Sequence, residues 1–111
     1  QMLDLKLYMA QRISAMIMGP LVLGHLAVMI YAIQGGLSSA EILSRTQGSI
    51  FWFVFYGTFV IAVSVHAAIG MRVIMHEWLG LKGVTLPLFT WSLCLILLFM
   101  GARAVTAVTL L

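Results

Sequence analysis

The chain has 111 residues, of which 63% are hydrophobic and only 8% are charged. A soluble domain carries about 25% charged residues, so this composition excludes a soluble globular enzyme, a disordered tail and a nucleic-acid-binding module. The net charge of +3 is therefore a signal of membrane attraction and topology. The single cysteine, Cys94, excludes a disulfide bond within the chain.

Three long stretches without any Asp, Glu, Lys or Arg divide the chain. They are residues 13–40, 46–71 and 83–102. Each reaches the roughly 20 residues that cross a bilayer core as a helix, and helices are required there because lipid offers the backbone no hydrogen-bond partner. The prediction is an all-α, integral membrane, three-helix transmembrane bundle that forms a single domain over residues 1–111. The helices are expected over about residues 8–34, 48–78 and 86–109.

The expected helix boundaries coincide with residues that end or begin helices. Gly35 and Gly36 follow the first apolar stretch and should stop its helix. Ser38 and Glu41 have the spacing of a capping box, which predicts a short surface helix between the first two spans. Pro20 lies inside the first span and should bend it, because proline cannot donate the helical hydrogen bond.

The basic residues predict the orientation in the membrane. Four of them fall on one side of the predicted topology: Lys6, Arg12, Arg72 and Lys82. The other side holds Arg45, balanced by Glu41, and Arg103. Because cytoplasmic loops carry the excess of Lys and Arg, the amino terminus is expected in the cytoplasm.

Two histidines, His25 and His66, are the polar residues expected deepest in the membrane, whereas His76 follows Arg72 near the surface and needs no special explanation. Ionisable groups inside a span usually face a cavity or a partner. One interpretation is a hydrogen bond across helices, to Ser14, Ser64, Thr58 or a partner helix. The other is axial ligation of a b-type haem iron by imidazole.

Small and basic residues near His66 are compatible with haem. Gly70 lies one turn after His66 on the same face and would leave room for a porphyrin. Arg12 and Arg72, near the expected cytoplasmic surface, are candidates to pair with haem propionates or a quinone carbonyl. Snorkelling to lipid phosphates is the alternative for both arginines.

These residues resemble a known family. The run from His66 through Gly70 and Arg72, followed by Glu77, resembles the His-x-x-x-Gly-x-Arg-x-x-x-x-Asp motif of cytochrome b membrane anchors of succinate dehydrogenases and fumarate reductases. The segment from Gln11 to Ser14 resembles the His-Arg-x-Ser segment that opens the first helix of these anchors. The resemblance covers nearly the whole chain and implies that the three helices are part of a larger helical anchor.

The resemblance implies roles for individual residues. His66 corresponds to an axial haem ligand, and Arg12 and Ser14 to residues that line the quinone site or meet a propionate. Glu77 corresponds to the acid after the motif, and Trp78 replaces a tyrosine that contacts quinone. The chain departs from the family at Gln11 and Val73, where family members have or often have histidine.

His25 implies a second haem. The stretch from Gly19 to Val28 resembles the first helix of two-haem anchors, in which a histidine holds the haem farther from the cytoplasm. Counting from Arg12 and Arg72, His25 lies roughly 11 Å farther out than His66 at 1.5 Å per residue. We therefore expect two haems, each completed by a histidine of a partner anchor, in preference to a single haem.

The predicted function is that of a subunit that is not catalytic alone. It would pass electrons between the iron–sulfur subunit of a succinate dehydrogenase or fumarate reductase-type complex and membrane quinone. The implied partners are a flavoprotein subunit, the iron–sulfur subunit, a second membrane-anchor chain and the lipid membrane, with no nucleic acid. The expected location is the bacterial inner membrane, in preference to the mitochondrial one. The alternatives are an anchor of a different quinone-linked dehydrogenase and a haem-free transport or assembly subunit.

Overall fold

The computed structural model describes residues 2–110, and every regular element in them is helical. The elements are α1 (Met2–Gln34), α2 (Ser39–Thr46), α3 (Ile50–Leu79) and α4 (Thr85–Thr109). Among the described residues, α1, α3 and α4 are long and apolar enough to cross a membrane. The predicted all-α fold with three spans is therefore confirmed.

The observed helix bounds differ from the predicted ones mainly at the start of the chain. The first helix begins at Met2, six residues before the predicted residue 8. Asp4 lies in its first turn, where a carboxylate stabilises the partial positive charge of the helix amino terminus. The other predicted bounds of the long helices agree with the structure to within two residues.

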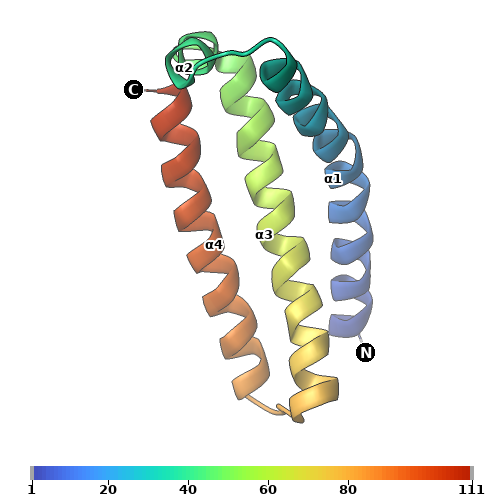
Figure 1. The fold of residues 1–111 in the computed structure, drawn as a ribbon. Coiled ribbons are helices and arrows are strands. Elements are labelled where there is room, and N and C mark those ends of the chain that lie inside the picture. The colour runs from blue at the N-terminus through green and yellow to red at the C-terminus, as the bar shows by residue number, and fades with distance from the viewer. Residues whose placement is uncertain (1, 111) are drawn as a thin grey trace.

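The three long helices form one layer with α3 in the middle. α1 and α4 each pack against α3, and Figure 1 shows the three helices side by side in this order. The amino terminus and the α3–α4 connection lie at one end, and α2 and the carboxyl terminus lie at the other (Figure 1). This arrangement agrees with the predicted grouping of Lys6 and Arg12 with Arg72 and Lys82.

Few apolar side chains are buried inside this layer. The buried ones are Ala62, Ala68, Ile69, Leu86 and Val105. Many large apolar side chains point outward instead, with Leu23, Trp91 and Phe99 more than 60% exposed. Such outward faces are stable where lipid or another apolar helix covers them.

The predicted end of the first helix is confirmed in atomic detail. The amide of Leu37 donates to the carbonyl of Ala32 (3.1 Å), and the amide of Gly36 donates to that of Ile33 (3.1 Å). Gly36 has a φ of 64°, which costs glycine little. The pair of bonds is a Schellman motif, which satisfies carbonyls that the helix end leaves unpaired.

The predicted capping box is also present and starts α2. The Ser38 hydroxyl accepts from the Glu41 amide (3.2 Å), and the Glu41 carboxylate accepts from the Ser38 amide (3.2 Å). After α2, the Gly48 amide donates to the Thr109 carbonyl at the end of α4 (2.6 Å). These bonds hold α2 across the end of the helical layer.

Proline bends α1 without ending it. Pro20 lies inside α1, which continues to Gln34, and Figure 1 shows α1 changing direction partway along its length. The bend agrees with the prediction, because the proline ring removes one hydrogen bond and crowds the preceding turn.

The close packing of α3 on α4 generates the first prediction. A side-chain carbon at Gly101 would overlap the side chain of Val60, whereas one at Gly57 would have no neighbour within 4 Å. Gly101→Ala should therefore destabilise the protein by about 1–3 kcal/mol through overpacking. Gly57→Ala, the matched control, should gain roughly 0.5–1 kcal/mol from helix propensity. Thermal unfolding in detergent measures both, and adding Val60→Ala should rescue Gly101→Ala. Equal melting temperatures for the two single variants would contradict the close contact.

Candidate functional site

His66 is half-buried in α3 and faces a serine of α1. Ser14 is only 5% exposed, and its Oγ lies 3.4 Å from Nδ1 of His66. The same hydroxyl donates its proton to the Gln11 carbonyl (3.0 Å). A hydroxyl has one proton, so towards His66 it acts as the acceptor. This arrangement fits a ring that carries a proton on Nδ1 and keeps the lone pair on Nε2.

One turn after His66, Gly70 faces the same helix. A side-chain carbon at Gly70 would lie 3.7 Å from Nε2 of Gln11, which is an ordinary contact. Oε1 of Gln11 is buried and has no hydrogen-bond partner in the described part of the chain. Gln11 therefore borders the space beside Gly70 and presents an unsatisfied acceptor there.

His25 lies at a different depth from His66. Its ring makes edge-on contacts with Tyr56 and Phe59, each with a centroid distance of 5.7 Å. These residues precede His66 by seven to ten positions on α3, which places His25 roughly 10–15 Å from His66 along the helix axis. The register of α1 against α3 thus agrees with the predicted difference in depth.

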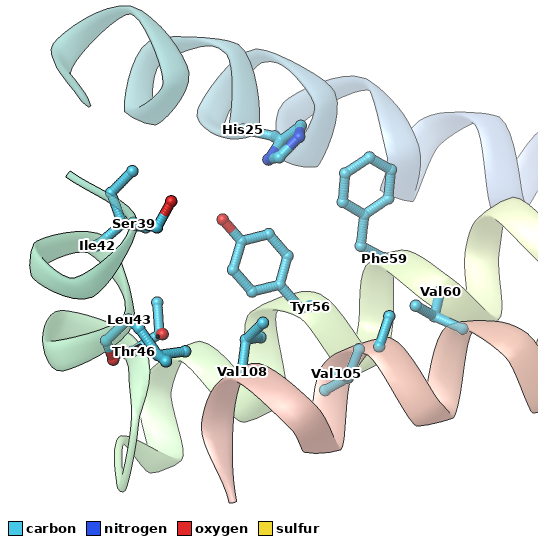
Figure 2. Close-up of a pocket in the computed structure, with 11 residues that line it drawn as sticks. His25, Ser39, Ile42, Leu43, Thr46, Tyr56, Phe59, Val60, Val105 and Val108 are labelled. Carbon is cyan, nitrogen blue, oxygen red and sulfur yellow. Dashed lines mark hydrogen bonds between the residues drawn. The ribbon is translucent and has the colours of Figure 1, made fainter. Parts of the chain in front are cut away.

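A cavity of about 600 Å³ opens beside His25. Figure 2 shows His25 from α1, Tyr56 and Phe59 from α3, and residues of α2 and α4 around it. Its lining is mostly apolar, with Ser39 and Thr46 of α2 among the few polar groups. Nδ1 of His25 is buried and has no hydrogen-bond partner within residues 2–110.

A second cavity, of about 480 Å³, lies between α1 and α3 at the opposite end of the layer. It is the more polar of the two. Its polar lining residues are Asp4, Tyr8, Gln11, Arg72, His76 and Glu77. This cavity brings together two of the predicted site residues, Arg72 and Glu77.

The other predicted quinone-site residues lie outside the lining of this second cavity. Arg12 is exposed, donates to the Tyr8 hydroxyl (3.4 Å) and lies over the Tyr8 ring. Ser14 borders a smaller cavity of about 280 Å³ together with Thr58. Trp78 is 81% exposed.

The sequence analysis missed four polar residues that line the 480 Å³ cavity, namely Asp4, Tyr8, Gln11 and His76. Gln11 counted there only as a departure from a family pattern, and His76 only as a surface residue. Nδ1 of His76 lies 2.9 Å from the Leu81 carbonyl, just beyond the end of α3. The signal that could have found His76 is its spacing, since it lies one turn after Arg72 on the same helix face.

Comparisons with known proteins agree with the resemblance. The family model of the succinate dehydrogenase/fumarate reductase transmembrane subunit matches residues 1–108. No curated protein and no solved structure gives a significant match.

The contact between Ser14 and His66 generates a prediction about the tautomer of His66. In the isolated protein, nitrogen chemical shifts of labelled histidine should place the His66 proton on Nδ1. Ser14→Ala removes the acceptor, so the proton should shift towards Nε2, and stability should fall by about 0.5–1.5 kcal/mol for the lost hydrogen bond. Ser92→Ala, at an exposed serine of α4, is the control and should change neither quantity. A His66 ring protonated mainly on Nε2 in the wild type would contradict the assignment.

Proposed function

The chain belongs to the succinate dehydrogenase/fumarate reductase transmembrane subunit family, and we propose that it is a cytochrome b anchor that carries electrons between an iron–sulfur subunit and membrane quinone. The family and the three apolar helices make it a transmembrane anchor subunit. The proposal adds haem b, a quinone site and the orientation of the chain in the membrane.

The contact of His66 with Ser14 is the observation that carries the haem proposal. A metal-ligating histidine commonly donates its second N–H to a fixed acceptor, which holds the ring and its tautomer. Ser14 is such an acceptor for Nδ1 (3.4 Å), and its own proton is occupied by Gln11. Nε2 of His66 thus has the lone pair that an axial haem ligand requires.

His25 is proposed to hold a second haem. Its buried Nδ1 lacks a partner, and the mostly apolar cavity of about 600 Å³ lies directly beside it. The helix register separates His25 from His66 by roughly 10–15 Å along the helices, so the two side chains would hold different haems. Each histidine is therefore proposed to bind its own haem, and a partner anchor supplies the other ligand. When bound, haem b supplies one-electron transfer.

Quinone is proposed to bind at the more polar end of the molecule. Glu77 and Arg72 border the 480 Å³ cavity, and Arg12 flanks it through its hydrogen bond to Tyr8. Ser14 supports the site from the next turn of α1. Trp78, 81% exposed on α3, is proposed to meet quinone where a partner subunit covers it.

The open helical layer fits an assembly with other subunits. We propose that a second anchor chain and lipid cover the apolar outward faces, and that an iron–sulfur subunit and a flavoprotein subunit bind at the end with the amino terminus. That end holds four of the six Lys and Arg residues, which supports a cytoplasmic position in a bacterial inner membrane.

The haem proposal predicts distinct losses in two variants. Dithionite-reduced minus oxidised spectra of the purified complex should show two b-type haems per copy of this chain. His66→Ala and His25→Ala should each remove one of them, because each variant deletes one axial ligand. His76→Ala is the matched control and should retain both.

Other spectra would contradict parts of this proposal. Complete loss of haem in both variants, with the complex still assembled, would indicate one shared haem. A wild-type complex without haem would refute the cytochrome assignment and leave a haem-free anchor.

The orientation is tested with single cysteines in a Cys94→Ala background. Ser44→Cys, on α2, should react with a membrane-impermeant maleimide added to intact spheroplasts. Lys82→Cys, in the α3–α4 connection, should react only after lysis, because the two positions lie at opposite ends of the helices. The reverse pattern would contradict a cytoplasmic amino terminus. The control is the Cys94→Ala variant without an added cysteine, which should not be labelled.

A further inference from the structure

His76 lies where the carboxyl end of α3 borders the polar cavity. It shares the lining with Arg72 and Glu77 of its own helix and with Asp4, Tyr8 and Gln11 of α1. The exposed fraction of its side chain puts it in contact with the aqueous surface. His76 therefore connects the surface to the interior of the cavity.

The hydrogen bond to Leu81 determines what His76 can do. A carbonyl oxygen only accepts, so Nδ1 of His76 (2.9 Å from it) donates its proton. This bond fixes the ring and leaves Nε2 as the nitrogen that can meet a molecule in the cavity. Histidine is the side chain suited to gain and lose a proton near neutral pH. Nε2 can thus exchange protons while Nδ1 holds its own proton in place.

Gln11 faces the same cavity from α1 and provides a hydrogen-bonding group for a bound molecule. Its buried Oε1 has no partner in the part of the chain described. An amide presents an acceptor and a donor on the two sides of one group. Such a group pairs equally with the hydroxyl of a quinol and, after rotation, with the carbonyl of a quinone.

From this arrangement we propose that His76 exchanges the proton at one quinone oxygen in the α1–α3 cavity, while Gln11 positions the ring by a hydrogen bond. This inference rests on the proposed function. It adds His76, for which the family resemblance suggested no role, and it gives a role to Gln11, which stands where the family has a histidine. The charged residues that share this lining with His76 are Asp4, Arg72 and Glu77.

The proton and electron balance of the step is simple. Reduction of a quinone to a quinol takes two electrons, which the iron–sulfur subunit supplies singly, and two protons. The Nε2–H bond of His76 breaks as an O–H bond forms on the nearer quinone oxygen, and water at the surface returns a proton to Nε2. The farther oxygen takes its proton from water. Quinol oxidation runs through the same steps in reverse.

The test uses the purified complex with all its subunits. Succinate-dependent reduction of a short-chain benzoquinone or naphthoquinone is followed across pH, together with reduction of a soluble dye by the flavin and iron–sulfur subunits. In the wild type, kcat for quinone reduction should fall as pH rises, because the proposed step needs the protonated ring of His76. His76→Gln should lose about 10²-fold in kcat and the pH dependence, with dye reduction unchanged.

Further variants separate proton exchange from a structural role. Imidazole should restore part of the quinone activity of His76→Ala. Gln11→Leu should raise KM but keep the pH dependence. Lys82→Gln removes a charge from the α3–α4 connection, outside the cavity lining. This control variant should match the wild type.

Several results would overturn the inference. One is a His76→Gln enzyme with the wild-type kcat and pH profile. Another is a His76→Ala enzyme whose quinone reduction is not restored by imidazole. This second result is the deciding test if His76→Gln also loses dye reduction, because the first comparison then no longer isolates the quinone step. A wild-type complex that reduces the dye but no quinone would overturn the proposed function together with this inference, whereas the first two results would leave the proposed function intact.

Discussion

The antiparallel packing of α1 against α3 determines which polar groups meet inside an otherwise apolar molecule. Ser14 reaches His66, Gln11 reaches Gly70, and Gly24 lies against Phe55. A shift by one residue would rotate α1 by about 100° and separate each of these pairs. Inside lipid, no water is present to form hydrogen bonds with the separated polar groups. The register is thus held by the polar contacts as well as by packing.

This register gives the two ends of the layer different chemistry. The end with the amino terminus has a cavity lined by acids, an arginine and an amide. The end with α2 has a larger and mostly apolar cavity in which His25 and Tyr56 are among the few polar side chains (Figure 2). His66 lies between the two along α3. In the proposed function, haems held by His25 and His66 would form a line from the outer part of the membrane to the proposed quinone site.

The three histidines differ in how their ring nitrogens are satisfied. His66 meets a hydroxyl on a neighbouring helix, and His76 meets a carbonyl at the end of its own helix. His25 has a buried nitrogen without a partner and two aromatic rings at its edges. A fixed first nitrogen is what the proposed roles require, in haem binding for His66 and in proton exchange for His76. The unsatisfied nitrogen of His25 is explained most simply by a bound group or a partner chain.

The positions of the helices followed from local features of the chain, namely the charge-free stretches, the capping box at Ser38 and the Gly35–Gly36 stop. The different depths of His25 and His66 also followed, because helix rise converts residue number into distance. The faces by which α1 and α3 contact each other could not be predicted, because both helices are apolar all round and hydrophobic periodicity marks no inner face. Gln11 and Arg12 are neighbours in sequence, yet packing turns Gln11 to the cavity and Arg12 to the surface. The same packing places His76 at the cavity and Trp78 outside it. Each residue along a helix turns the side-chain direction by about 100°, so these two residues point about 200° apart, and the contacts between helices select which side faces inward.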